Sequence, residues 1–232
     1  MMRLDVALRV DATCDTLRGG DGGAMHTWTI PHGLYFSPED LAAEIQTWAV
    51  ADIHASATVT VVDGAFVFTW PGTIVLDWPC PRLRDWLGFA ADVNAASPQT
   101  APAQCRGTFI AALPWSAPSP LSWRLDLARA PTWRGSGRSV LRAIHREWSV
   151  TARVTSTEMA QLRRVLGALL AGMPCKLWLD VDNADPFGTS DPYGYIKAWL
   201  SPAGRDYLER WMALPARHAC EVDLVLSEYV TP

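Results

Sequence analysis

Apolar and polar residues alternate along several segments of this chain, and this period of two constrains its fold more than any other feature. The segment 3–11 carries apolar residues at every second position: Leu4, Val6, Leu8 and Val10. The segments 140–154 and 219–229 alternate in the same way. Successive side chains of a β-strand point to opposite faces, so each segment predicts a half-buried strand. We therefore expect a mainly β protein of the α+β class.

A hairpin and further short strands complete the β content. The segments 57–62 and 65–70 are joined by Asp63-Gly64, a dipeptide that favours a tight hairpin turn. Residues 18–24 form a glycine-rich loop whose spacing does not fit a phosphate cradle, and we expect a hairpin tip or an interface loop there. Further strands are predicted over 26–30, 73–78, 108–113, 121–127, 175–181 and 193–200.

Two helices have clear start signals. Ser37 precedes Pro38 and two acidic residues, which predicts a helix over 38–50. Thr155 and Glu158 have the spacing of a capping box, and a helix over 157–171 should end at Gly172. A short helix is predicted over 81–87, ended by Gly88, while residues 205–213 fit a helix or a strand equally well.

The length and the order of these elements predict two β-sheet or sandwich units, each with one main flanking helix. A chain of 232 residues can hold one large domain or two small ones. We expect a β-rich N-terminal domain over 1–92 and a C-terminal β-sandwich over 121–232. The segment 93–120, rich in Ala, Ser, Pro and Gln at its start, is interpreted as a linker or a long excursion.

The net charge and the cysteines limit the classes of binding partner and the cellular compartment that we expect for this chain. The net charge of −4 argues against binding to a nucleic-acid backbone, and no apolar run is long enough to cross a membrane. The chain lacks a recognisable signal peptide, so we expect synthesis in the cytoplasm. Its five cysteines are scattered, and an odd number predicts buried thiols in a reducing compartment: Cys14, Cys80, Cys105, Cys175 and Cys220.

The usual catalytic motifs are missing from the sequence. The histidines are dispersed, and we find no zinc-protease, nucleophile-elbow or P-loop pattern. We therefore expect no enzyme activity, no catalytic residue and no cofactor. A weak calcium candidate is Asp180, Asp182 and Asp185, although the spacing fits a polar turn better than a calcium loop.

Twelve tryptophans are an unusual number for this length. They can fill a core, but a core does not easily hold all of them, so we expect some at subunit contacts. Arginines recur at positions 134, 138, 142 and 146, and arginine suits ion pairs between subunits. The interface candidates are Trp115, Trp133, Arg134 and Arg138.

Two stretches carry a resemblance to a known class of protein. The run Thr29-Ile30-Pro31-His32-Gly33-Leu34-Tyr35, followed by Ser37, Leu41-Ala42 and Ile45, is similar to a helix entry in phage and other viral particle proteins. Leu87-Gly88-Phe89 resembles the ending that follows the hairpin in those proteins. The region 146–229, which contains Gly194-Tyr195-Ile196, resembles the β-sandwich of phage tail-tube and distal-tail proteins.

The resemblance implies a structural protein of a phage particle, in the tail tip, baseplate or tube. Such a protein assembles into rings and contacts other virion proteins, so the expected location is the virion and a small-molecule ligand is not expected. A capsid decoration protein or a head–tail connector is an alternative. A carbohydrate-binding module that uses tryptophan stacking, or an enzyme whose site is assembled only in space, remain further alternatives.

Overall fold

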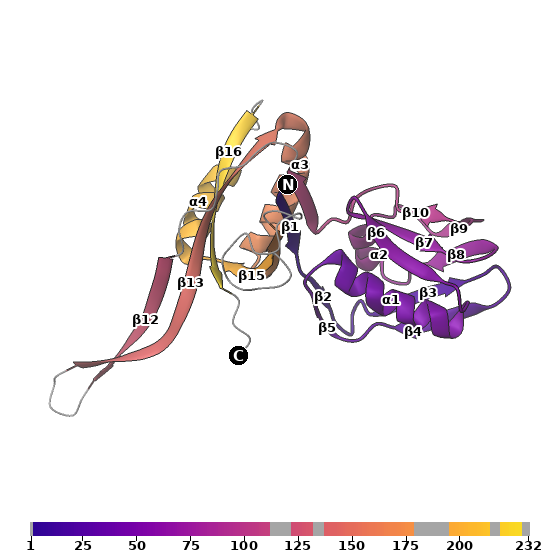
Figure 1. Cartoon of the computed structure of the whole chain (residues 1–232), viewed down its shortest axis with the longest axis horizontal. Coiled ribbons are helices and arrows are strands. Elements are labelled where there is room, and N and C mark those ends of the chain that lie inside the picture. The colour runs from indigo at the N-terminus through magenta and orange to yellow at the C-terminus, as the bar shows by residue number, and fades with distance from the viewer. Residues whose placement is uncertain (1, 112–121, 132–136, 179–194, 214–218, 229–232) are drawn as a thin grey trace.

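The chain folds around two separate hydrophobic cores (Figure 1). The computed structural model describes residues 2–111, 122–131, 137–178, 195–213 and 219–228. One core gathers residues between Leu8 and Cys105, which we call the N-terminal unit. The other combines Leu4, Val6 and Phe109 with residues from Trp148 onward, and we call residues 2–6 and 108–228 the C-terminal unit.

The N-terminal unit is built from short antiparallel strands in three small sheets. One sheet has the order β4-β3-β8-β9, another β10-β7-β6, and β2 pairs with β5. The strands are β2 (Leu8–Val10), β3 (Thr16–Gly20), β4 (Met25–Thr29), β5 (Gly33–Tyr35), β6 (Thr58–Val62), β7 (Ala65–Thr69), β8 (Thr73–Asp77), β9 (Val93–Ala96) and β10 (Gln99–Thr100). The predicted hairpin is confirmed: Asp63 and Gly64 both have positive φ between β6 and β7.

Two helices pack on these sheets, and both begin and end where the sequence predicts within a few residues. In α1 (Pro38–Asp52), the Ser37 side chain accepts from the backbone N–H of Asp40 and the Asp40 side chain accepts from that of Ser37. The short helix α2 (Pro81–Leu87) ends at Gly88, which has φ 89°. The core between these elements is strongly aromatic, with Phe66, Phe68 and Trp70 all buried.

The C-terminal unit is one antiparallel sheet of seven strands, in the order β11-β1-β14-β15-β16-β13-β12. Its strands are β1 (Met2–Val6), β11 (Thr108–Ala111), β12 (Ser122–Pro131), β13 (Gly137–Thr155), β14 (Cys175–Trp178), β15 (Tyr195–Leu200) and β16 (Ala219–Glu228). The N-terminal unit is therefore inserted between two neighbouring strands, β1 and β11, which pair from Met2 with Ala111 to Asp5 with Thr108.

Two helices, not a second sheet, cover the apolar face of this sheet. The capping box of Thr155 and Glu158 starts α3 (Ser156–Leu170), as predicted. The segment that was ambiguous forms α4 (Pro202–Met212), capped by Ser201. Leu166 of α3 and Trp211 of α4 share one core with the strands. The predicted mainly β, α+β class is confirmed. Within the described residues, the C-terminal unit has two helices on one sheet in place of the predicted sandwich with a single helix, because both helices present apolar side chains to the sheet.

The strand predicted over 3–11 is divided between the two units. Residues 2–6 join the seven-stranded sheet and residues 8–10 pair with β5, so the chain crosses between units at Ala7. The segment 93–100, interpreted as linker, adds β9 and β10 to the sheets of the N-terminal unit. The N-terminal unit therefore begins and ends later in the chain than the predicted domain 1–92, because its core runs from Leu8 to Cys105.

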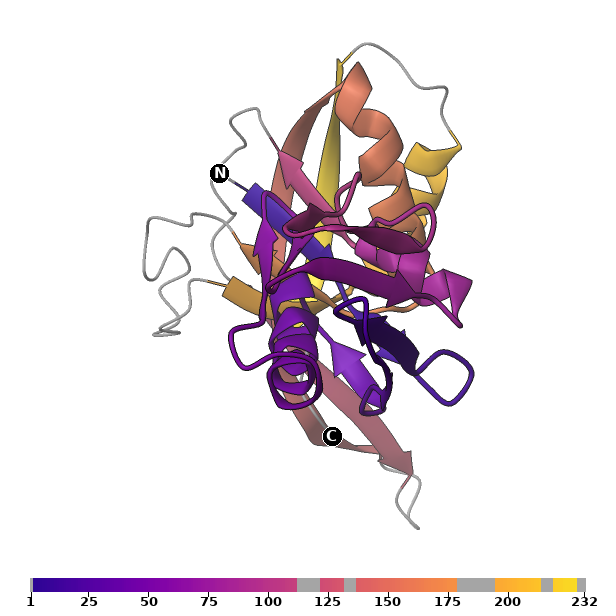
Figure 2. The same cartoon turned by 90° about the vertical axis from the view of Figure 1, so that its right-hand side faces the viewer.

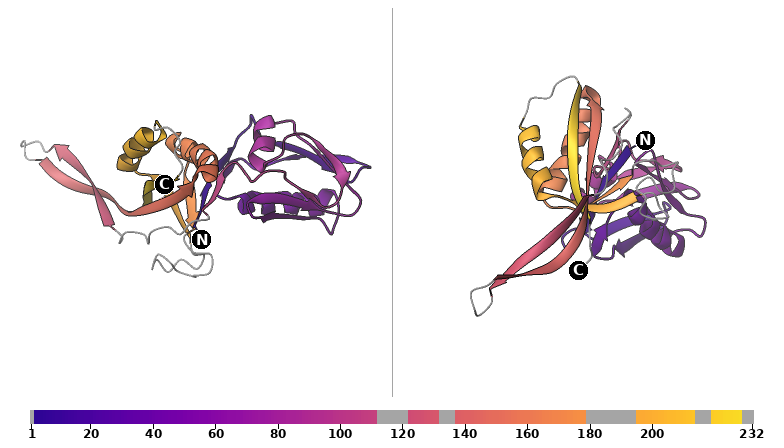
Figure 3. Two further views of the ribbon diagram at one scale, coloured as in Figure 1. Left: turned by 90° about the horizontal axis from the view of Figure 1, so that it is seen from above. Right: turned by 60° about the vertical axis from the view of Figure 1, so that its left-hand side comes forward.

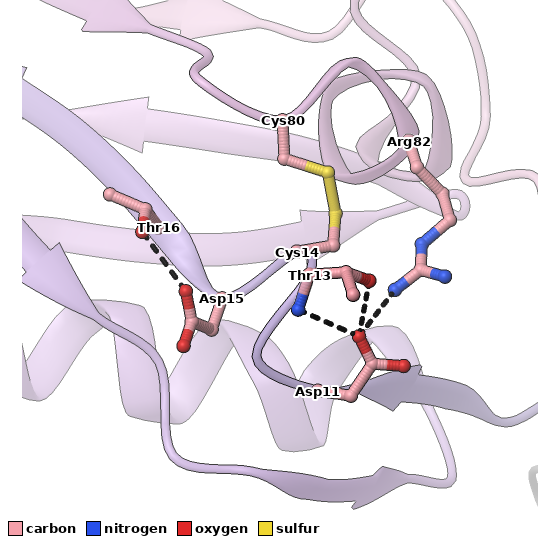
Figure 4. The surroundings of a disulfide bond; sticks show 7 residues. All are labelled: Asp11, Thr13, Cys14, Asp15, Thr16, Cys80 and Arg82. Carbon is pink, nitrogen blue, oxygen red and sulfur yellow. Dashed lines mark hydrogen bonds and ion pairs between the residues drawn. A yellow bond between two sulfur atoms is a disulfide. The ribbon is translucent and has the colours of Figure 1, made fainter.

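The expectation of five thiols is wrong for two cysteines, because Cys14 and Cys80 form a disulfide across 66 positions of sequence (Figure 4). Their Cα atoms are 5.4 Å apart, within the range that a disulfide requires. The bond ties the loop before β3 to the start of α2. Cys105 and Cys175 are buried free thiols, and burial raises the pKa of Cys175 to about 12.

Candidate functional site

The most distinctive surface feature is a two-stranded arm that leaves the C-terminal unit (Figure 1). Residues Glu147–Thr155 of β13 pair with β16, but residues 137–146 pair only with β12 among the described strands. We call residues 122–131 and 137–146 the arm. At the rise of an antiparallel strand it extends about 30 Å. It points away from the N-terminal unit in Figure 3 and lies behind that unit in Figure 2.

The backbone of the arm has hydrogen-bonding groups that its own two strands do not use. A two-stranded ribbon has two outer edges, and each edge presents unpaired N–H and C=O groups. An isolated ribbon of this kind is marginally stable in water, so a third strand or a packed surface is needed to order it. The arm is therefore the part of the C-terminal unit best suited to pair with another chain.

The register places apolar residues at alternate positions along the arm. Trp123, Leu125 and Leu127 lie opposite Arg146, Ile144 and Leu141, with a shift in register between Asp126 and Leu127. Alternate positions of a strand share one face, so the ladder continues the pattern of Trp148 and Val150, which are buried in the core. The alternation of the core residues Trp148 and Val150 thus continues along the sequence into the arm.

The arm is also basic in an acidic protein. Its two strands hold five arginines and one aspartate, giving a net charge of +4, and the whole chain carries −4. The residues outside these strands therefore carry a net charge of −8. The arginines of the arm are Arg124, Arg129, Arg138, Arg142 and Arg146. Opposite charges on two parts of one chain favour contact between copies.

A buried polar network fixes the N-terminal unit on the second face of the large sheet. Asp5 is fully buried and accepts hydrogen bonds from Thr108 Oγ1 at 2.8 Å and Trp178 Nε1 at 3.0 Å. Arg3 forms an ion pair with Asp5 at 3.0 Å and reaches Glu39 of α1 at 2.7 Å. Burial raises the pKa of Asp5, and the neighbouring Arg3 and Thr108 oppose that rise.

Lys176 makes the second cross-unit contact of this network. Its ammonium group donates to Asp40 Oδ1 at 3.0 Å and to Ser37 Oγ at 3.2 Å, at the start of α1. It also lies 4.6 Å from the centre of the Tyr195 ring, a cation–π distance. These contacts hold one end of α1 against β14 and β15, so the network sets how the inserted unit is oriented on the sheet.

Most of the predicted site residues lie outside the described part of the chain. This applies to Trp115, Trp133 and Arg134, and to the calcium candidates Asp180, Asp182 and Asp185. Arg138 lies in β13, paired with Ala130 in the arm. Sequence analysis did not identify the junction residues Asp5 and Lys176. The only local signal for these two residues was a charged side chain within a predicted strand. No neighbouring residue indicates that the N-terminal unit covers that face of the sheet.

The tryptophans serve mainly as core residues where they are described. Six are buried, namely Trp48, Trp70, Trp78, Trp86, Trp148 and Trp211. Trp28 stacks on Trp48 with ring centres 5.6 Å apart, and Gly19 leaves room for the Trp48 ring. Trp199 is 36% exposed. The described residues therefore give little support to a sugar-stacking platform built from several tryptophans.

Neither metal-binding clusters nor membrane-spanning helices occur within the described ranges. No group of three or more His, Cys, Asp or Glu side chains is placed there to hold a metal ion. Among the helices of these ranges, none combines the length and the apolar character needed to span a membrane. Comparison with family models, curated proteins and solved structures found no match to this chain.

Proposed function

We propose that this chain is a non-enzymatic structural subunit of a phage particle, in the tail tip, baseplate or tube. It works by assembling into rings with further copies and by contacting other virion proteins. The observation that supports this proposal is the arm, a basic ribbon whose two outer edges pair with no further described strand. Such an element has no evident use in an isolated monomer.

Three kinds of interaction can drive assembly through the arm. The open edges can pair with a strand or loop of a neighbour, which satisfies backbone groups that are otherwise left to water. Apolar side chains along one face can be buried against that neighbour. The positive charge of the arm steers it toward the negative remainder of the next copy. Ring symmetry repeats each weak contact around the assembly.

The segments that resemble phage particle proteins also meet in one place in the fold. Ile30 and Leu41, from the helix entry, lie in the core of the N-terminal unit together with Leu87 and Phe89. Two segments that match other proteins only by their order along the chain need not pack in the same core. Their shared core supports the view that the resemblance reflects a common structural motif.

The decisive experiment shortens the arm without touching either core. Residues 124–145 are replaced by Asn-Gly, so that Trp123 and Arg146 close a two-residue hairpin. Because the described core residues of β13, Trp148, Val150 and Val154, all lie outside the replaced segment, the variant should keep the parent's circular dichroism and unfolding midpoint. Negative-stain electron microscopy and light scattering should show rings or tubes for the parent at high concentration, and monomers for the variant.

A pair of single substitutions tests the charge of the arm. Arg138→Glu reverses one charge within the arm and should raise the concentration needed for assembly. Arg205→Glu is the matched control, because Arg205 is an exposed arginine of α4 and not part of the arm. The proposal fails if the parent remains monomeric at every concentration and binds no other virion protein, or if the shortened variant assembles as well as the parent.

A further inference from the structure

A cleft of about 390 Å³ lies where the N-terminal and C-terminal units meet. Both connections between the units pass along it, at residues 6–9 and 106–107, and helices α2 and α3, with Met173 just after α3, contribute the remaining walls. Its volume is in the range of sites that bind small organic molecules. The cleft is separate from the arm and from the network around Asp5 and Lys176.

Four arginines line this one cleft: Arg9, Arg82, Arg106 and Arg164. Arg9 and Arg164 are exposed, and neither has an ion pair or a side-chain hydrogen bond to any described residue. Arg82 contacts Asp11 at 3.4 Å, drawn in Figure 4, and Arg106 contacts Asp85 at the same distance. Both of these arginines are more than half exposed, so their ion pairs are weak and leave donors available.

An apolar wall and one further donor complete the cleft. Leu8, Ala168 and Met173 line it together with Trp86. The Trp86 indole N–H makes no hydrogen bond within the described residues, and it lies beside Gly107. A Cβ at position 107 would be 3.1 Å from Trp86 Nε1 and 2.7 Å from the Val6 carbonyl oxygen. The absence of a side chain there keeps this corner of the cleft open.

We propose that the cleft binds a small organic anion with an apolar body. A carboxylate or phosphate group would accept hydrogen bonds from Arg9, Arg164 and the Trp86 indole, because guanidinium groups match the geometry of both anions. The apolar part would lie against Leu8, Ala168 and Met173. Arg9, Arg82 and Arg106 belong to the N-terminal side of the junction and Arg164 to α3, so a bound anion would link the two units.

This inference goes beyond assembly and does not depend on it, since none of the cleft residues lies in the arm. Two features restrict the class of ligand. Four guanidinium groups around one small space repel cations, which excludes amines. The apolar wall adds affinity only for a ligand with carbon atoms to bury, so an inorganic anion alone should bind more weakly.

Isothermal titration calorimetry of the full chain tests the proposal with named probes. Hexanoate and hexyl phosphate present an anionic head and an apolar body, and they distinguish a carboxylate from a phosphate ligand. Acetate and inorganic phosphate present the head alone, and hexylammonium reverses the charge. At least one of the two hexyl anions should bind about tenfold or more tightly than its head alone. Hexylammonium should not bind.

Substitutions in the cleft link that binding to its residues. Arg9→Gln and Arg164→Gln should each weaken the tighter hexyl anion by about tenfold, as expected for loss of one charge-assisted hydrogen bond. Arg205→Gln, on the exposed face of α4, is the matched control and should leave the affinity unchanged. The proposal is overturned if neither hexyl anion binds at millimolar concentration, if hexylammonium binds equally well, or if the cleft variants bind like the parent.

Discussion

The N-terminal and C-terminal units use β-structure in opposite ways. Strands of the N-terminal unit have between two and five residues and lie in three small sheets around one aromatic core. The C-terminal unit has one sheet, and its longest strand, β13, runs for 19 residues. Among the residues whose burial is described, that strand places Trp148, Val150 and Val154 in the core, and it continues into the arm.

The N-terminal unit is thus organised around its own core, whereas the arm of the C-terminal unit is available for assembly. The short strands of the N-terminal unit contribute their apolar residues to one shared core. Residues 137–146 of β13 pair with no described strand besides β12, so one edge of that segment is left for another chain to pair with. The two units also differ in crosslinking, because the disulfide lies wholly within the N-terminal unit. Variants confined to one unit test how independent the two units are.

The largest effect on stability is expected from removing a buried side chain in one core at a time. Phe68 and Leu166 are each fully buried, in different cores. Phe68→Ala should cost about 3–5 kcal/mol and Leu166→Ala about 2–5 kcal/mol. Hydrogen–deuterium exchange should show lost protection mainly in residues 8–105 for the first and mainly in the seven-stranded sheet for the second.

The two core variants also act as controls for each other. If each substitution exposes amides across both units to the same extent, the chain unfolds as one cooperative body. The division into two independent cores would then have no energetic meaning, although it would still describe the geometry.

An intermediate effect is expected from the crosslink that only one unit has. The double variant Cys14→Ser, Cys80→Ser removes a bond that closes a loop of more than 60 residues. It should lower the stability of the N-terminal unit by about 2–4 kcal/mol, because the unfolded chain regains freedom. Thermal unfolding with and without a reducing agent measures this. A reductant that shifts the parent and the double variant equally would show that the parent's crosslink does not contribute.

The smallest effect is expected at the junction that joins the two units. Lys176→Met removes an almost buried ammonium group that contacts Asp40. Because Asp40 is 40% exposed and can be hydrated, the loss should be about 1–2 kcal/mol in urea unfolding. Lys197→Met is the matched control: Lys197 lies over the Phe36 ring but is exposed, so its loss should cost about 0.5 kcal/mol. Equal losses would remove the special role given to Lys176.

Local sequence signals were sufficient for the elements whose ends are set by neighbouring residues. Ser37 with Asp40 and Thr155 with Glu158 start α1 and α3, because a capping side chain satisfies backbone groups three residues away. Asp63-Gly64 and Gly88 adopt positive φ at a hairpin turn and at a helix end. The same kind of signal, Ser201 before Pro202, starts α4, although the apolar spacing after it did not distinguish a helix from a strand.

Only the tertiary structure decided what depends on partners far away in the sequence. Alternation marks residues 3–11 as strand, but the division at Ala7 follows from pairing with β11 and β14 on one side and β5 on the other. The Cys14–Cys80 bond and the burial of Asp5 likewise require segments to meet across 66 and 103 positions. A sequence encodes backbone preference residue by residue, whereas strand order, disulfide pairing and an unpartnered arm are set by which surfaces meet in the folded chain.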